Sequence, residues 1–486
     1  MTDGIDMEIN AALRTGGADY HELYRPQFHF TARTGWLNDP NGLVYYAGEY
    51  HLFFQHNPAG NEWANMHWGH AVSTDLLHWR QLPNAIMPDR AGTAFSGSAV
   101  VDNENTSGLR SGAESVIAAL YTAAGGTSAE SAGEPFTQCL AYSNDRGRTW
   151  TKYAGNPVLP HIVGENRDPR VIWYAPGRFW VMSLFLDAGS FGLFTSSDLK
   201  RWTRIQTLSM DGSECPDFFP ISIEGEPGEE RWVFVAANGS YVVGTFDGKQ
   251  FVPEAGERAA KPWTSTALTS ATGQFSLDLG GNYYAMQTFS NIPASDGRRI
   301  QIAWMAGGVY PDMPFNQQMS IPSVLTLRRL PEGLRLFRYP VAEVESLRTG
   351  TREWRQAAVA AGHDPLAGIT GDLFDIEMEV DCPAASSFGL KVRGTEIRYD
   401  GAAQTLSCLG RTAPFAAIDG CVPLRILVDR ASIEIFAGGG RVCMSCCFTP
   451  PPPDLSLAFL TEDDGVHIVT MDVHTMKSVW PAGDDQ

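Results

Sequence analysis

The chain has 486 residues, 43% of them hydrophobic, so it is long enough to bury a large core and to form more than one domain. Its formal net charge is −19, and its Lys and Arg residues do not cluster. These features argue against nucleic acid and anionic membranes as partners and favour a neutral substrate.

The first informative element is GWLNDPNGL at 35–43, which places Asp39 between an asparagine and a proline. Asn, Asp, Pro and Gly are common turn residues, so a turn alone would explain them. The next residues read LVYYAGEYHLFF, two short β-prone runs on either side of Ala47-Gly48, which predicts a hairpin. Asp39 therefore lies at the start of a predicted hairpin.

The same opening recurs along the chain. Asp168 precedes a β-prone run, a Pro-Gly turn and a second apolar run in RDPRVIWYAPGRFWVMSLF, and Glu214 opens a third copy, ECPDFFPISIEGEPGEERWVFVAA. Two further starts are FSGSAVVD from Phe95 and FSLDLGGNYYAMQTF from Phe275. The sequence thus predicts five hairpin openings, near 39, 96, 168, 214 and 278.

A second series lies between these openings: STDLLHW at 73–79, SNDRGRTW at 143–150, SSDLKRW at 196–202 and the shorter TFDGKQF at 245–251. Each reads as a polar turn that delivers one aromatic residue into an outer strand. Repeats of roughly 45 to 70 residues with about four strands each are typical of a β-propeller. We expect an all-β chain with a five-bladed β-propeller at 20–338.

The pattern changes after Phe337. YPVAEVESLRTG reads as a short linker helix with Val341, Val344 and Leu347 on one face, and we place the linker at 339–350. Runs such as LFDIEMEV, GLKVRGTEIRY and LRILVDRASIEIFAGG then alternate with period 2, as half-buried antiparallel strands do. A C-terminal β-sandwich is expected at 351–480, with a role in bracing the propeller.

Six of the eight cysteines fall late in the chain: Cys382, Cys408, Cys421, Cys443, Cys446 and Cys447. No second pair or His cluster completes a zinc site, so buried reduced thiols are the favoured interpretation. The first twenty residues lack the basic start and apolar core of a secretion signal, and no apolar run is long enough to span a membrane. We expect a cytoplasmic protein, or a secreted one if a signal peptide has been removed.

The propeller geometry predicts what the acidic residues do. The first strand of each blade lines the central axis, so Asp39, Asp168 and Glu214 should converge in one aromatic-rimmed pocket. Three like charges oppose folding, and such an arrangement more often marks chemistry or a metal. Calcium is the competing occupant, but no dense DxDxDG loop is present. Two carboxyl groups across a glycosidic bond suffice for hydrolysis, and a third can stabilise the positively charged transition state.

Four motifs in this order resemble the signatures of glycoside hydrolase family 32, the invertase, inulinase and levanase group: WLNDPNG at 36–42, FSGSAVV at 95–101, RDP at 167–169 and ECPD at 214–217. The resemblance extends through YHELYRPQFHF at 20–30, GRRIQIAWM at 297–305 and VDRASIEIFAGGG at 428–440, and so covers nearly the whole chain. It implies a five-bladed propeller joined to a β-sandwich, with no cofactor and no metal.

The resemblance also implies roles. Asp39 would be the nucleophile, Glu214 the general acid/base, and Asp168 the transition-state stabiliser that holds hydroxyls of the fructosyl ring. The implied substrate-binding residues are Asn38, Gln55, Trp63, Phe95, Ser96, Arg167 and Trp304.

Structural roles compete for some of these residues. Trp63, Phe95 and Trp304 could pack between blades, and Gln55 could satisfy backbone groups in a hairpin. Cys215 is interpreted as a packing residue rather than a nucleophile, because no motif supplies a His partner. Two positions depart from the family pattern. Asn282 stands where a carboxylate is frequent, which affects specificity more than chemistry, and Ser323 stands where an arginine is common.

The predicted function is a retaining glycoside hydrolase that releases terminal β-fructofuranosyl units from fructans, fructo-oligosaccharides or sucrose, with a slight preference for the levanase and exo-inulinase branch. Alternatives are an invertase, a sucrose-6-phosphate hydrolase and a fructosyltransferase. A fructan-binding propeller without catalysis is a further alternative, but it would be expected to lose a carboxylate, and all three are present. The expected partner is a fructose-containing carbohydrate, and the pattern specifies no oligomeric state.

Overall fold

The computed structural model describes residues 20–210, 212–254, 275–451 and 454–481. Within these residues all regular structure is β-strand apart from one short 3-10 helix, η3 (Ala342–Leu347). The expectation of an all-β chain is confirmed. In the same part of the chain, no helix has both the length and the apolar character needed to cross a membrane.

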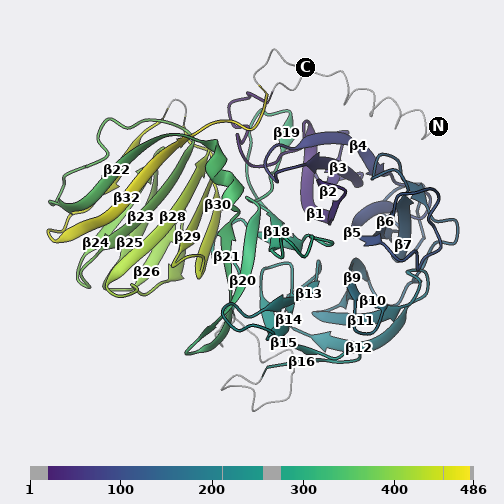
Figure 1. Cartoon of the computed structure of the whole chain (residues 1–486). Coiled ribbons are helices and arrows are strands. Elements are labelled where there is room, and N and C mark those ends of the chain that lie inside the picture. The colour runs from purple at the N-terminus through teal and green to yellow at the C-terminus, as the bar shows by residue number, and fades with distance from the viewer. Residues whose placement is uncertain (1–19, 211, 255–274, 452–453, 482–486) are drawn as a thin grey trace.

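Five sheets are formed by residues 35 to 340 (Figure 1). The first contains β1 (Gly35–Tyr46), β2 (Glu49–Asn57), β3 (His67–Ser73), β4 (Arg80–Ile86) and, parallel to β1, β19 (Phe315–Asn316). The second contains β5 (Thr93–Asp102), β6 (Val116–Ala124), β7 (Thr137–Ser143) and β8 (Thr151–Lys152). The third contains β9 (Arg167–Tyr174), β10 (Phe179–Asp187), β11 (Ser190–Ser196) and β12 (Thr203–Ser209).

The fourth and fifth sheets continue this antiparallel plan. The fourth contains β13 (Asp217–Ser222), β14 (Glu230–Val235), β15 (Tyr241–Phe246) and β16 (Phe251–Pro253). The fifth contains β17 (Tyr284–Thr288), β18 (Arg299–Trp304), β20 (Ser323–Leu330) and β21 (Gly333–Pro340). We refer to these five sheets as the five-sheet unit.

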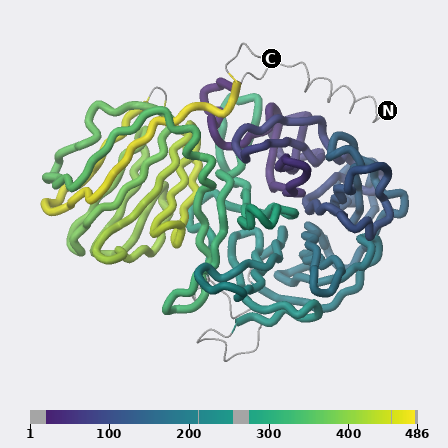
Figure 2. The backbone as a smooth tube through the Cα atoms, viewed as in Figure 1, coloured from purple at the N-terminus to yellow at the C-terminus, as the bar shows by residue number. Residues whose placement is uncertain are grey.

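The five sheets follow one another around a common centre (Figures 1 and 2). The first strand of each sheet contacts the first strand of the next: β1 with β5, β5 with β9, β9 with β13, β13 with β17, and β17 with β1. This closed ring places the beginnings of all five strands at one end of a shared axis.

Apolar clusters between consecutive sheets hold the ring together. Each cluster contains residues from two consecutive sheets. Examples are Phe53 and Ile117 from the first and second sheets, Leu120 and Met182 from the second and third, Phe191 and Phe234 from the third and fourth, Val233 and Met286 from the fourth and fifth, and Ile300 and Phe54 from the fifth and first. Inner strands such as β6 are therefore buried along their whole length, whereas outer strands such as β12 are largely exposed.

The fifth hairpin opening is the one that the sequence misplaced. It was expected near 278, but β17 begins at Tyr284. Residues before it pair with the C-terminal part of the chain: the amide of Leu279 donates to the Cys443 carbonyl (2.8 Å) and that of Asn282 to the Ser445 carbonyl (3.0 Å). A Cβ on Gly280 would lie 2.3 Å from the Ser445 carbonyl oxygen, so glycine allows this close approach. The segment that looks like a strand start is thus part of an interface.

After β21, η3 carries the chain out of the five-sheet unit. Val341, Val344 and Leu347 are fully buried, as the one-sided pattern predicts, although the helix is 3-10 rather than α.

Two sheets follow, which we call the two-sheet unit. The six-stranded sheet has the order β22 (Arg348–Val359), β32 (Val466–Met476), β23 (Phe374–Asp381), β28 (Cys421–Asp429), β29 (Ser432–Ala437), β30 (Val442–Cys447). The five-stranded sheet has the order β27 (Arg411–Pro414), β26 (Thr405–Cys408), β25 (Thr395–Asp400), β24 (Ser387–Val392), β31 (Leu457–Leu460). One core joins them, with Ile376 and Ile435 from the first and Leu390 and Leu406 from the second.

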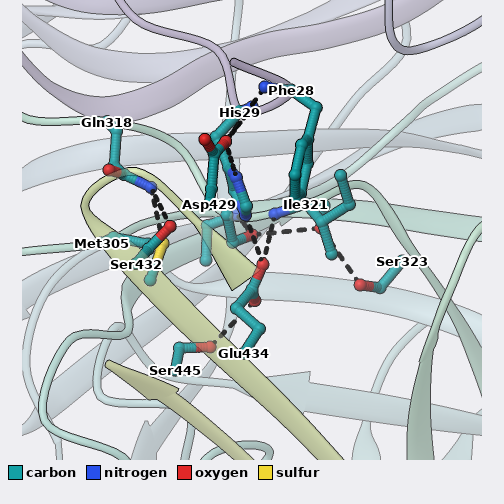
Figure 3. Close-up of polar contacts among 12 residues, drawn as sticks. Phe28, His29, Met305, Gln318, Ile321, Ser323, Asp429, Ser432, Glu434 and Ser445 are labelled. Atoms are coloured by element: carbon teal, nitrogen blue, oxygen red, sulfur yellow. Dashed lines mark hydrogen bonds and ion pairs between the residues drawn. The ribbon is translucent and has the colours of Figure 1, made fainter. Parts of the chain in front are cut away.

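A buried ionic network links the two units. His29 lies between two carboxylates of the two-sheet unit, with Nδ1 2.8 Å from Asp429 and Nε2 2.9 Å from Glu434 (Figure 3). Arg338 contacts the other oxygen of Glu434 (3.2 Å) and Asp278 (2.5 Å). All five side chains are fully buried, so removal of one partner would leave a buried charge uncompensated.

Candidate active site

The three predicted carboxylates lie where two innermost strands, β1 and β9, begin and just before a third, β13. The register of β1 against β2 shifts between Leu37 and Pro40, and that of β9 against β10 shifts across the Arg167–Arg170 stretch. Bulges of this kind re-aim side chains. Asp39 and Asp168 therefore sit on irregular backbone at the same end of the ring.

The thiol of Cys215 brings the carboxylates together. Its Sγ lies 3.4 Å from Oδ2 of Asp39 and 3.4 Å from Oδ2 of Asp168. Its backbone amide also donates to Oδ2 of Asp168 (2.9 Å). Because Cys215 directly follows Glu214, these contacts place all three acidic residues around one point.

The backbone at this point is strained. Asp168 has a φ of 66°, Glu214 of 41° and Cys215 of 39°, all in the left-handed region that residues with a Cβ rarely adopt. Such conformations persist only where the surrounding structure enforces them, and they cluster at functional sites. Here they turn the Glu214 side chain and the Cys215 amide toward the other carboxylates.

Each acidic residue has different hydrogen-bond partners. Asp39 accepts a hydrogen bond from the Ser96 hydroxyl (2.6 Å). Glu214 is held on both oxygens: Arg167 donates to Oε2 from Nε (3.1 Å) and Nη2 (2.8 Å), and Tyr284 donates to Oε1 (2.5 Å). These contacts fix the Glu214 carboxyl group in one orientation.

Burial and mutual repulsion separate the protonation behaviour of the two aspartates. The pKa of Asp168 is raised to about 7, first by burial and then by the charge of Glu214, against the attraction of Arg167. Burial also raises the pKa of Asp39, but the hydrogen bonds from Ser96 and Asn38 oppose this rise by stabilising the ionised form. Carboxyl groups whose environments differ in this way are typical of sites that carry out nucleophilic and acid/base chemistry.

The predicted substrate-binding residues differ in how they relate to these carboxylates. Ser96 and Arg167 contact Asp39 and Glu214 directly. Asn38 accepts a hydrogen bond from the Trp36 indole (2.9 Å), and Gln55 donates to the Ala94 carbonyl (3.0 Å), the backbone-satisfying role considered for it.

The three predicted aromatic residues form two groups. Trp63 and Phe95 pack edge to face with centroids 5.7 Å apart, and Trp63 is 54% exposed, an unusual exposure for a residue that only packs. Trp304 lies between Trp36 and Tyr284, with centroid distances of 6.1 and 6.2 Å. Tyr284 is hydrogen-bonded to Glu214, so a single residue, Tyr284, links Trp304 to the three acidic residues.

Sequence reasoning missed two residues of the site. Tyr284 was noted only as part of a family-like stretch, and Cys215 was taken for a packing residue. The position of Cys215 within ECPD, directly after a predicted acidic residue, was the available signal for it. Nothing local identified Tyr284, because its contact with Glu214 spans two sheets. Among the described residues, no three His, Cys, Asp or Glu side chains are grouped so as to hold a metal ion.

Comparisons with known proteins identify the family of the chain. The model of the glycosyl hydrolases family 32 N-terminal domain matches residues 29–340, and that of the family 32 C-terminal domain matches residues 343–475. The chain belongs to glycoside hydrolase family 32. The resemblance found in the sequence motifs is confirmed, and the protein is a glycoside hydrolase.

Individual family 32 relatives cover almost the whole chain. A levanase of Bacillus subtilis is 39% identical over 97% of this chain and 74% of its own length. An extracellular exo-inulinase of Aspergillus ficuum is 30% identical over 95% of this chain and 96% of its own length. Among solved structures, the exo-inulinase of Aspergillus awamori superposes with a TM-score of 0.83 at 27% identity, covering 95% of this chain and 100% of that chain.

A cavity of about 960 Å³ in the described part of the chain is not lined by Asp39, Asp168 or Glu214. A cavity of only about 10 Å³ is lined by Ser96, Asp168 and Cys215. The candidate active site is identified by the convergence of Asp39, Asp168 and Glu214 around Cys215, and not by cavity size. Arg170 lines both cavities and therefore lies between them.

Proposed function

We propose that this family 32 enzyme is a retaining, exo-acting β-fructosidase, which releases terminal fructose from fructans, fructo-oligosaccharides and sucrose. The observation that carries the proposal is the convergence of Asp39, Asp168 and Glu214 around Cys215, each with different partners. The levanase and exo-inulinase among its relatives support fructans as substrates.

The proposed fold is a five-bladed β-propeller at 20–338, a linker at 339–350 and a β-sandwich at 351–480. The ring of contacts among β1, β5, β9, β13 and β17 supports the propeller, and the shared core of the two C-terminal sheets supports the sandwich. In this fold the start of each innermost strand opens onto one end of the axis, which is where the acidic residues lie.

The first chemical step uses two of the acidic residues. The carboxylate of Asp39 attacks the anomeric carbon of the terminal fructosyl unit, and the bond from that carbon to the glycosidic oxygen breaks. The departing oxygen takes the proton of Glu214, whose orientation is fixed by Arg167 and Tyr284. The products of this step are the shortened sugar and a fructosyl ester on Asp39.

Hydrolysis of the ester completes the cycle. Glu214, now a carboxylate, accepts a proton from water, the water oxygen adds to the anomeric carbon, and Asp39 is released as a carboxylate. Asp168 accepts both of its hydrogen bonds on Oδ2, so its Oδ1 can accept hydrogen bonds from fructosyl hydroxyls. Such bonds strengthen as positive charge develops on the sugar.

The test is product analysis by anion-exchange chromatography after separate incubation with sucrose, inulin, levan and sucrose-6-phosphate. We expect free fructose from the polymers without intermediate oligomers, and a first product that retains the β configuration by NMR. Asp39→Asn should lower kcat by about 10⁴-fold or more without loss of folding. The exposed Asp187→Asn is the matched control and should leave kcat unchanged.

Other outcomes reassign the function. Cleavage of sucrose alone indicates an invertase, and a preference for sucrose-6-phosphate indicates a sucrose-6-phosphate hydrolase. Accumulation of longer oligosaccharides indicates a fructosyltransferase. Turnover that survives Asp39→Asn contradicts the assignment of the nucleophile.

A further inference from the structure

The cavity of about 960 Å³ lies at the opposite end of the axis from the carboxylates. Its lining includes the last residues of innermost strands, such as Asp102 of β5, Trp173 of β9 and Ser222 of β13. The acidic residues lie at the beginnings of β1 and β9, so the two sites occupy opposite ends of the ring. The volume falls at the upper end of the range of pockets that hold small ligands, roughly 300–1,000 Å³.

Arg299 lines this cavity and forms no ion pair with a carboxylate among the described residues. Among the described residues its guanidinium donates only to the Pro220 carbonyl (3.0 Å) and lies over the ring of Phe219, 5.3 Å from the centroid. Below it, Nη1 of the buried Arg170 has no hydrogen-bond acceptor in the described part of the chain. Guanidinium N–H groups of Arg299 and Arg170 can therefore still donate hydrogen bonds to a ligand in the cavity.

Most carboxylates of the lining are already satisfied. Asp102 accepts hydrogen bonds from the amides and hydroxyls of Thr106 and Ser107. The other satisfied carboxylates are Glu104 with Arg178, Glu224 with Arg328 and Asp296 with Arg298. The exception is the exposed Glu230, whose carboxylate has no ion-pair or hydrogen-bond partner within the described residues. Within the described residues the lining therefore carries one carboxylate without a partner, Glu230, and one arginine without a carboxylate partner, Arg299, and their charges are opposite.

An aromatic surface completes the lining. Trp173 is partly exposed and packs edge to face on Trp180, with centroids 4.8 Å apart. The indole of Trp180 donates to the Thr106 hydroxyl (2.8 Å), which fixes the pair. A fixed aromatic face can bind the apolar side of a ligand whose other side is polar.

We propose that this cavity is a second, non-catalytic binding site for a neutral oligosaccharide. Sugar hydroxyls both donate and accept, so one ring can give hydrogen bonds to Glu230 and receive them from Arg299 while its C–H face packs on Trp173. A charged ligand would leave one of the two side chains opposed by a like charge. The choice of a fructan chain as the sugar rests on the proposed function. The site would bind a part of the polymer that is far from the end being cleaved.

The test measures binding directly in the Asp39→Asn background, where the sugar is not consumed. Isothermal titration uses a linear fructo-oligosaccharide of four units, and the Asp39→Asn protein is the reference. When Arg299→Met or Glu230→Gln is added, the protein should bind one molecule fewer, or one of its sites should bind about tenfold or more weakly. The two single changes check each other, because Glu230 is exposed and its replacement leaves the core untouched. Arg201→Met, an exposed arginine paired with Asp198 and outside the cavity, is the control.

Unchanged stoichiometry and affinity in both cavity variants would overturn the proposal. Binding of inorganic phosphate that depends on Arg299, with no sugar bound there, would also overturn it in favour of an anion site. Failure of the proposed function is a separate result, namely no fructose released by the unmodified enzyme. With Arg299→Met alone, turnover of sucrose should be unchanged, while KM for levan should rise.

Discussion

The hydroxyl of Tyr284 donates a hydrogen bond to Oε1 of Glu214, although the two residues are 70 positions apart and belong to neighbouring parts of the ring. Arg167 donates hydrogen bonds to the other oxygen, so both carboxyl oxygens of Glu214 accept hydrogen bonds. A general acid must meet the glycosidic oxygen at a defined angle, so this clamp sets the geometry of proton transfer.

Tyr284→Phe removes the hydrogen bond to Oε1 of Glu214 and keeps the aromatic ring of the side chain. We expect kcat on sucrose to fall about tenfold with little change in KM, because the lost bond orients the acid rather than the sugar. The measurement is steady-state kinetics. Tyr283→Phe is the matched control, since the Tyr283 hydroxyl donates to Gln301 and not to the acidic cluster. Equal rises in KM for both variants would contradict the positioning role.

Cys215 allows a graded substitution. Cys215→Ser keeps a donor beside Asp39 and Asp168, whereas Cys215→Ala leaves both Oδ2 atoms without that contact. We expect the alanine variant to lose roughly ten times more kcat than the serine variant, in line with the cost of one charge-assisted hydrogen bond. If both variants are equally active, the thiol serves packing alone, as the sequence suggested.

Asp168→Asn should stabilise the protein while it abolishes activity. Burial raises the pKa of Asp168 to about 7 in the folded state, whereas in the unfolded chain it returns to about its ordinary value of 3.8. The folded state thus holds the proton more tightly, and stability is lost as pH rises from about 3.8 to about 7. At pH 8 the variant should gain at most about 4 kcal/mol in the free energy of unfolding.

Urea unfolding at pH 4 and pH 8 checks this prediction. The gain should be small at pH 4, where the folded state carries the proton and the unfolded state still carries it in nearly half of the molecules, and full at pH 8. Asp187→Asn provides the control at an exposed position. A gain that is the same at both pH values would contradict an origin in the ionisation of Asp168.

His29 predicts a second dependence on pH, at the boundary between the two units. Burial alone lowers the pKa of a histidine, but hydrogen bonds to Asp429 and Glu434 outweigh it and raise the pKa of His29 to about 9. Its ordinary value is 6.5, so the stability that it contributes is complete below pH 6.5 and is lost as pH rises to about 9. The loss should reach about 3 kcal/mol at most.

Thermal unfolding from pH 6 to pH 10 tests this expectation. His29→Gln should be less stable than the unmodified protein at pH 6.5 and should show a flatter decline between pH 6.5 and 9. His78→Gln is the control, because His78 is an exposed histidine paired with Asp75. An unchanged decline in His29→Gln would assign the pH dependence to another group.

Local sequence determined much of this protein. Alternation of apolar residues set the strands, and the repeated carboxylate ahead of a β-prone run pointed to Asp39, Asp168 and Glu214 before any contact was known. These signals are readable because the alternation of side chains along a strand and the chemistry of a turn depend on residues close together in the sequence. The four short motifs also placed the chain in its family.

Tertiary structure decided what those signals could not. The stretch around Asp278 carries the sequence of a strand start, yet it is fixed in the interface by Arg338 and Ser445, residues far along the chain. Tyr284 and His29 gain their roles from partners on other sheets, and Arg299 is left free because Asp217 pairs with Arg170. The physical reason is common to all of them: burial and charge compensation depend on which distant side chains share a space, and local pattern carries no record of that.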